Sequence, residues 1–119
     1  MDHRIRAAIE VMRANLSKRM SIAEMARAVN MSRGRFCRVF KAHMSLSPSL
    51  YIKSLRMREA EKMLSETFLS VKEIRAELGN LDRGRFSRDF KQFCGFTPTQ
   101  FRTRLTGDSH TSPTHYAAD

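Results

Sequence analysis

Hydrophobic residues return every three or four positions along most of the chain, which is the spacing of one face of an α-helix. The first such stripe runs through residues 3–17. Two later stretches, 47–65 and 97–105, open with a hydroxyl residue followed by proline, a favourable way to begin a helix. Together with two pairs of shorter helices described below, the pattern predicts an all-α fold of about seven helices and no strand.

The chain contains an internal repeat. Residues 21–55 align with residues 70–105 when the second copy has one extra residue in its turn. The sequence Arg-Gly-Arg-Phe occurs at 33–36 and again at 83–86. Further matched pairs are Arg38 with Arg88, Phe40 with Phe90, Lys41 with Lys91, Pro48 with Pro98, and Leu55 with Leu105. This agreement indicates that one supersecondary unit occurs twice.

Each copy is expected to form two short helices separated by a tight turn. The first helix opens with the spacing of a capping box, at Ser21–Glu24 and Ser70–Glu73, and the second follows an N-cap at Ser32 or Asp82. The inward stripes of the second helices are Phe36, Val39 and Phe40, and Phe86, Phe90 and Phe93. Their other faces stay polar and basic, which predicts helix-turn-helix units at about 21–44 and 70–95.

A long helix is expected to join the two helix-turn-helix subdomains over about 47–65. At about 1.5 Å per residue it is nearly 30 Å long, comparable to the roughly 34 Å between successive major-groove openings on one face of DNA. The whole domain is predicted to span residues 1–106. The polar, turn-rich tail at 107–119 is expected to be disordered.

Charge narrows the possible partners. The chain has 119 residues with 22 Lys and Arg against 12 Asp and Glu, a net charge of +10 that points to a polyanion. From Met25 to Arg58 there is no acidic residue at all. No apolar run is long enough for a membrane span or a signal peptide, so we expect a cytoplasmic protein with no membrane partner and with Cys37 and Cys94 reduced.

The polar face of each second helix is the candidate DNA-binding surface. Arg38 and Arg88 can each present a fork of donors to guanine O6 and N7, which makes them the first candidates for base recognition. Gly34 and Gly84 allow close approach of the backbone to a groove. The flanking arginines suit phosphates. The full set is Arg33, Gly34, Arg35, Cys37, Arg38 and Lys41, and Arg83, Gly84, Arg85, Ser87, Arg88 and Lys91.

Other chemistry has little support. An enzyme is not expected, because no acid-base pair, no nucleophile with an orienting histidine and no phosphate-cradling glycine loop can be found. His43 is placed on the largely inward side of its helix. The spacing of the histidines and cysteines predicts no metal or cofactor site; the histidines are His3, His43, His110 and His115. The repeated phenylalanines could stack on bases, but their helical phase favours a core role.

Two other functions stay open. The basic charge alone would suit an architectural or nucleic-acid-coating protein that binds without reading bases, and such a protein would not prefer an operator over random DNA. The basic helices could instead dock onto an acidic protein such as a polymerase subunit.

Three stretches carry a resemblance to a known family. They are SIAEMARAVNMSRGRFCRVFKAHMSLSPSLYI, LRMREAEKMLSE, and VKEIRAELGN continued by LDRGRFSRDFKQFCGFTPTQFR. Over roughly residues 5–105 the chain resembles the DNA-binding domain of the AraC/XylS transcription regulators. The resemblance implies double-stranded DNA as ligand, with recognition helices at about 33–44 and 83–94 in adjacent major-groove segments. It also implies activation through RNA polymerase, with Gly34, Cys37, Arg38, Gly84, Arg85 and Arg88 as readers.

The second copy departs from the family pattern. Arg75 replaces a small residue, like Ala26 in the first copy, and is expected to extend its charge to solvent. Leu81 is expected to supply the apolar plug of the turn one position late. With seven acids between Glu59 and Asp89, these departures lead to the hypothesis that the first copy carries most of the DNA affinity. Because two units share one chain, a stand-alone protein would bind DNA as a monomer; the chain could equally be a fragment of a longer regulator.

Overall fold

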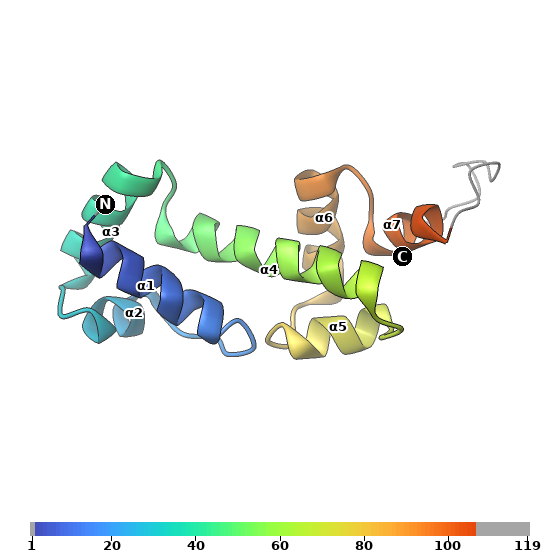
Figure 1. The fold of residues 1–119 in the computed structure, drawn as a ribbon, viewed down its shortest axis with the longest axis horizontal. Coiled ribbons are helices and arrows are strands. Elements are labelled where there is room, and N and C mark those ends of the chain that lie inside the picture. Colours follow the sequence, from blue (N-terminus) through green and yellow to red (C-terminus); the bar gives the residue numbers. More distant parts are fainter. Residues whose placement is uncertain (1, 107–119) are drawn as a thin grey trace. The chain divides into compact units, whose positions relative to one another are not determined.

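The computed structural model describes residues 2–106, and all regular structure within them is helical (Figure 1). The helices are α1 (His3–Ala14), α2 (Ile22–Ala28), α3 (Arg33–Met44), α4 (Pro48–Glu66), α5 (Val71–Glu77), α6 (Arg83–Cys94) and α7 (Pro98–Leu105). The prediction of an all-α fold with seven helices is confirmed. The tail at 107–119, expected to be disordered, lies outside the described residues.

Local hydrogen bonds set the helix starts where the sequence placed them. In both capping boxes the backbone N–H of the first serine donates to the glutamate, Ser21 to Glu24 at 2.8 Å and Ser70 to Glu73 at 2.7 Å. These bonds hold the pKa of Glu24 and of Glu73 below the usual value of a glutamate. The predicted caps of both helix-turn-helix units are therefore confirmed.

α1 is shorter than predicted. It ends at Ala14 instead of residue 17, because Asn15 leaves the helical conformation with φ −127°. The Asn15 side-chain amide donates to the carbonyl oxygen of Val11 at 2.7 Å, so it competes with the backbone for that acceptor. An asparagine at this position ends the helix although the apolar spacing continues to Leu16.

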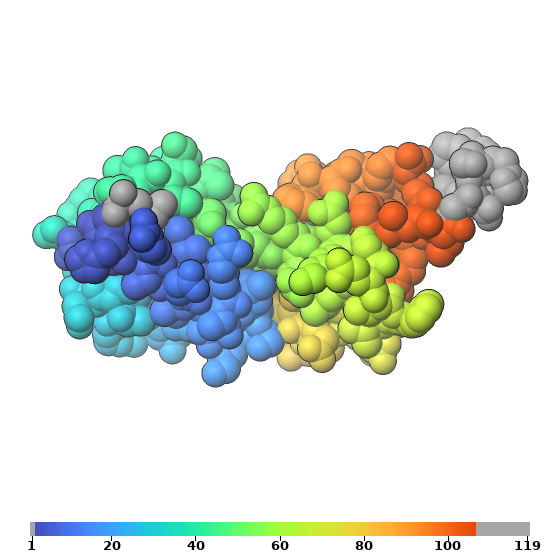
Figure 2. Space-filling view, viewed as in Figure 1, coloured from blue at the N-terminus to red at the C-terminus, as the bar shows by residue number. Residues whose placement is uncertain are grey.

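The chain forms two compact units that divide within α4, after Arg56. Each unit has its own buried cluster of apolar side chains. In the first unit α1 contacts both α2 and α3, and Figure 2 shows it, in dark blue, at the surface beside them. The division means that each helix-turn-helix is supported by its own core.

The same aromatic contacts occur in both units. Phe36 and Phe40 are fully buried, and the ring of Phe40 meets that of Tyr51 edge-on at 5.5 Å between centroids. In the second unit the ring of Phe90 meets that of Phe101 edge-on at 5.6 Å. The sequence repeat is thus also a packing repeat, and the expected core role of the repeated phenylalanines is confirmed.

Two side chains predicted to face inward, His43 and Phe93, do not, and Leu50 of α4 is exposed as well. Leu50 and Phe93 keep 50% and 38% of their surface exposed, and His43 is exposed, with Nδ1 3.0 Å from the carbonyl oxygen of Val39. Leu50 is two residues before the buried Ile52, on nearly the opposite side of α4. His43 and Phe93 are equivalent in the repeat, and the half-buried residue after each of them packs against the core instead.

The end of α3 offers a stability test. Ser45 terminates α3 in the left-handed conformation with φ 64°, and the equivalent residue after α6 is Gly95 with φ 95°. Because glycine adopts this conformation without strain, Ser45→Gly should stabilise the first unit by about 0.5–1 kcal/mol in urea unfolding. The reciprocal variant Gly95→Ser should destabilise the second unit. A loss of stability in Ser45→Gly would contradict this assignment.

Candidate nucleic-acid interface

The structure places each set of candidate DNA-binding residues on the outer face of one helix. On α3 the side chains of Arg33, Arg35, Arg38 and Lys41 are exposed, with Gly34 exposed between them and Cys37 half-buried. The equivalent positions of α6 have the same exposure, with Ser87 half-buried in place of Cys37. The phenylalanines on the inner face, two in each helix, fix this orientation because they are buried in the core.

The two glycines of this surface are not required by packing within the protein. A methyl group on Gly34 would lie 3.5 Å from Nη1 of Arg38, and one on Gly84 would lie 3.6 Å from Nη1 of Arg88. Both are ordinary van der Waals distances, and neither glycine needs a left-handed backbone. Packing within the described residues therefore does not explain the glycine in the first turn of α3 and α6.

The two helices and their N-caps differ in acidic groups. α3 has four basic side chains and no acid, and its N-cap Ser32 is uncharged. α6 contains Asp89 and begins after Asp82, whose carboxylate accepts from the backbone N–H of Arg85 at 2.9 Å. That bond, followed by the charges of Arg85 and Arg88, holds the pKa of Asp82 below its usual value. Asp82 is therefore ionised at neutral pH and attracts Arg88.

The turns before these helices also differ. In the first unit Asn30 adopts φ 60°, whereas the longer turn of the second unit has Gly79 at φ 98° and Asn80 at φ 57°. Leu81 packs against the core of the second unit, as expected for the late apolar plug. The extra residue is thus accommodated by two successive left-handed residues.

The expectation for Arg75 was wrong. Its side chain is half-buried instead of extending to solvent, and Nη1 donates to the carbonyl oxygen of Leu81 at 3.1 Å. Its Nε is buried and has no hydrogen-bond partner within residues 2–106. The arginine turns toward the loop because the longer turn presents a backbone carbonyl within its reach.

A pocket of about 290 Å³ that the sequence did not predict opens beside Arg75. It is lined by Val71, Lys72, Arg75, Arg83 and Thr99. Of these only Arg83 was a candidate site residue. The signal available in the sequence was the replacement of Ala23 and Ala26 of the first copy by Lys72 and Arg75 in the second.

Other candidate chemistry gains no support. Cys37 and Cys94 are half-buried free thiols, and burial raises the pKa of Cys94. Within the described part of the chain, no three His, Cys, Asp or Glu side chains gather closely enough to hold a metal ion. No helix in that part is both long and apolar enough to cross a membrane. His110 and His115 lie outside the described residues.

Comparisons of the sequence and of the structure with known proteins both find transcription regulators. The chain is 31% identical over 102 residues to the HTH-type transcriptional regulator ArgR of Pseudomonas aeruginosa, covering 86% of this chain and 31% of that protein. A transcriptional regulator with an AraC-type DNA-binding domain from Chromobacterium violaceum superposes with a TM-score of 0.81 at 26% identity, over 89% of this chain and 95% of that one.

The DNA-binding domain of AdpA, a global transcriptional factor solved with a target DNA, has the same fold. It superposes with a TM-score of 0.83 at 18% identity, over 91% of this chain and 97% of that one. The chain spans about a quarter to a third of the length of the first curated relatives that it matches. A family model described as a helix-turn-helix domain matches residues 25–104, and the chain therefore belongs to the AraC-type helix-turn-helix family.

Proposed function

We propose that the chain is a sequence-specific, double-stranded DNA-binding transcription regulator that inserts α3 and α6 into adjacent major-groove segments. The observation that carries this proposal is the pair of exposed basic faces, each on the outer side of a helix whose inner side is fixed by two buried phenylalanines. If these residues only kept the surface soluble, there would be no reason for the same basic pattern to recur on both helices, each time opposite the same pair of buried phenylalanines. A major groove is wide enough to admit one helix.

The residues divide by the part of DNA that they can reach. In this proposal Arg38 and Arg88, in the middle of their helices, donate to guanine O6 and N7. Arg33, Arg35, Arg83 and Arg85 lie in the first turn, where they neutralise phosphates and set the register of the protein on DNA. Lys41 and Lys91 lie in the last turns and add to the phosphate contacts. Cys37 and Ser87 complete the groove-facing sets.

Membership of the AraC-type family supports a regulatory role. We propose that the chain acts in the cytoplasm, as a monomer on DNA when it stands alone, and activates transcription by contact with RNA polymerase. A DNA-binding transcription regulator needs no catalytic site, and we propose that the chain is not an enzyme. In a longer protein the same residues would form the DNA-binding part.

Genomic DNA capture tests the proposal. Purified protein is mixed with sheared DNA of its source organism at about 0.15 M salt, and the bound fragments are sequenced. We expect a small number of strongly enriched fragments that share a motif and lie upstream of genes. Even coverage, with binding that only weakens as salt rises, would indicate a nucleic-acid-coating protein instead.

The glycines provide a variant that separates stability from binding. Gly34→Ala should stabilise the first unit by about 0.5–1 kcal/mol in urea unfolding, because alanine has the higher helix propensity and the added methyl meets no close contact. Affinity for an enriched fragment should nevertheless fall by about ten-fold, because the methyl lies where the backbone approaches the groove. Arg27→Ala, an exposed change on α2, is the control. Unchanged affinity in Gly34→Ala would exclude close approach at this position.

A further inference from the structure

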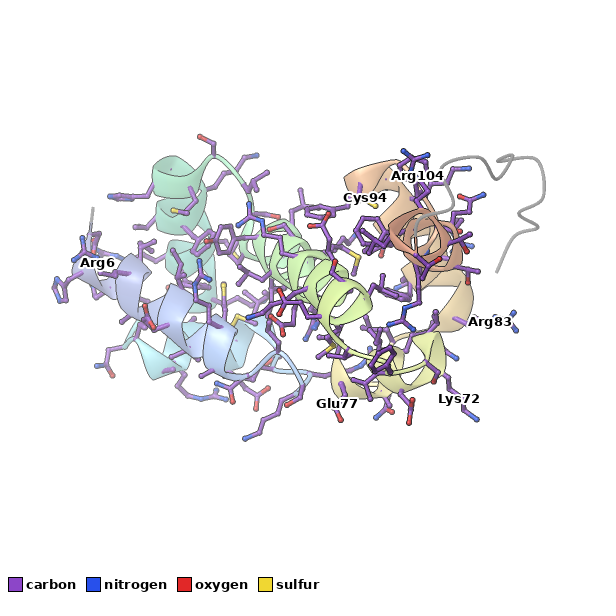
Figure 3. The ribbon with its side chains drawn as sticks, turned by 45° about the vertical axis from the view of Figure 1, so that its right-hand side comes forward. Arg6, Lys72, Glu77, Arg83, Cys94 and Arg104 are labelled. Carbon is purple, nitrogen blue, oxygen red and sulfur yellow. The ribbon has the colours of Figure 1, made fainter. Side chains whose placement is uncertain are left out.

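The second unit contains a basic pocket outside the outer faces of α3 and α6. Its volume is about 290 Å³, and its walls come from the start of α5, the start of α6 and the start of α7. Three of the five lining side chains are basic, Lys72, Arg75 and Arg83, and none is acidic. Figure 3 shows Lys72 and Arg83 extending to the same side of the unit, with Glu77 at the other end of α5. The charge of the pocket walls therefore favours binding of an anion.

The internal repeat shows that two of the three basic side chains of this pocket are peculiar to the second unit. Lys72 and Arg75 align with Ala23 and Ala26, so the two copies share a fold but differ by two positive charges at this place. Ala26 is buried in the core of the first unit, where an arginine would have to displace its neighbours. The second copy keeps Arg75 half-buried because its longer turn supplies the Leu81 carbonyl as an acceptor.

The guanidinium of Arg75 has one hydrogen bond that fixes its position and one donor without a partner within residues 2–106. Nη1 is fixed by its 3.1 Å bond to Leu81, which limits the rotation of the group. Nε is buried without an acceptor inside the described part of the chain. A buried donor left without a partner is costly, so a bound anion beside the guanidinium would favour this arrangement. An oxyanion in the pocket would lie beside Arg75, which lines it, and add charge-assisted hydrogen bonds to the guanidinium.

We propose that this pocket binds one phosphate group of the DNA backbone beside α6. The proposal rests on the proposed function, since it names a contact within the same DNA complex. A guanidinium with an adjacent ammonium and a hydroxyl, that of Thr99, matches the charge and the several acceptor oxygens of a phosphodiester. The volume is slightly below the roughly 300 Å³ at which pockets for small organic ligands begin, which favours a part of a larger ligand.

The pocket lies at the start of α6, where a phosphate contact would affect how this helix binds DNA. Arg83 is the first residue of α6, so a phosphate held there would fix where that helix enters the groove. The N-cap of α6 is the charged Asp82 where α3 has the uncharged Ser32, and this carboxylate opposes the approach of DNA. Lys72 and Arg75 therefore offset the negative charge that Asp82 adds at the start of α6.

To test the phosphate contact, Lys72 and Arg75 are both replaced by alanine, the residue at the equivalent positions of the first copy. Lys72→Ala with Arg75→Ala is compared with wild type on an enriched duplex by fluorescence anisotropy at several salt concentrations. Loss of one phosphate contact should make the negative slope of log K against log salt shallower by about 0.9 and leave the base preference unchanged. The matched control, Arg58→Ala with Lys62→Ala, removes two exposed charges from α4 in the same unit and should change the slope less.

A second variant leaves the Arg75 bond to Leu81 in place. Thr99→Glu puts a carboxylate at the pocket, where it should compete with phosphate and make the negative slope shallower by a similar amount, about 0.9. Unfolding of each variant is followed by circular dichroism, and if the double alanine variant does not fold, Thr99→Glu decides. An unchanged slope in a folded variant, or an equal change in the control, would overturn the pocket assignment.

Two further arms separate the possible sources of the phosphate and the possible failures. Inorganic phosphate is titrated into the DNA-free protein while the Arg75 Nε–H signal is followed by NMR. Saturation by free phosphate together with an unchanged salt slope would assign the pocket to a soluble anion and overturn the DNA contact. If wild type itself shows no base preference, the proposed function fails. If wild type keeps its base preference but the slope does not change, only the pocket assignment fails.

Discussion

Replacing Arg38 with alanine should weaken binding to an enriched duplex by about 5- to 150-fold at about 0.15 M salt, the loss of one bidentate guanine contact. Replacing Arg88 should cost only about two- to five-fold, because the Asp82 carboxylate already attracts Arg88 in the unbound protein. Equilibrium anisotropy titrations with the same duplex measure both losses. Circular dichroism checks that the variants keep their helices.

The difference between the two arginines has an electrostatic origin that can be tested by itself. Asp82→Ser gives the second unit the uncharged N-cap that Ser32 provides in the first. In this background the affinity should rise, and Arg88→Ala should then cost more than it does in wild type. Equal losses for Arg38→Ala and Arg88→Ala in wild type would contradict a dominant first unit.

Replacing Arg102 with methionine should destabilise the second unit by about 2–4 kcal/mol. The guanidinium donates to the carbonyl oxygens of Leu64 at 3.3 Å and Thr67 at 3.2 Å, and also to that of Leu69. It therefore fixes the end of α4 and the segment leading to α5. Methionine keeps the length and apolar stem of the side chain but removes all of these charge-assisted bonds.

The effect should be local as well as large. The melting temperature of the second unit should fall by roughly 10 to 20 °C, while amide hydrogen exchange in α1 to α3 stays close to wild type. Arg104→Met is the control, because Arg104 is exposed and lies 4.4 Å over the ring of Phe96, a contact worth about 0.5–1 kcal/mol. Similar losses of stability in both variants would show that the hydrogen bonds of Arg102 do not fix the end of α4 and the segment leading to α5.

Most of the fold could be predicted because its signals are local. The capping boxes, the N-caps and the prolines after hydroxyl residues each involve residues within four positions, and the structure has helices at all of them. The repeat added the equivalence of the two units, including the burial of Phe36 and Phe86. The outer faces of α3 and α6 followed from the same helical phase.

What sequence could not supply depends on contacts between distant residues. Arg102 donates to residues 33 to 39 positions earlier, and no spacing rule identifies such partners. Arg75 was expected to reach solvent because its family position is small, but the extra turn residue places the Leu81 carbonyl within its reach. The pocket beside it needs the starts of α5, α6 and α7 together, and these come from positions 71–99.

The division of the chain into two units has a functional consequence. Each recognition helix is held by its own core, so a change in one face should blur one part of the recognised sequence without unfolding the other unit. The roles of the two units can therefore be separated by single substitutions. This separability distinguishes base reading by two helices from attraction by net charge.

Selection of bound sequences from a random duplex pool at about 0.15 M salt, with wild type, Arg38→Ala and Arg88→Ala, tests base reading by both helices most directly. We predict a shared motif with two parts about one helical turn apart, roughly 10 base pairs, with one part blurred in each variant. Absence of any enriched motif in wild type, or the same motif in all three proteins, would contradict sequence reading by α3 and α6.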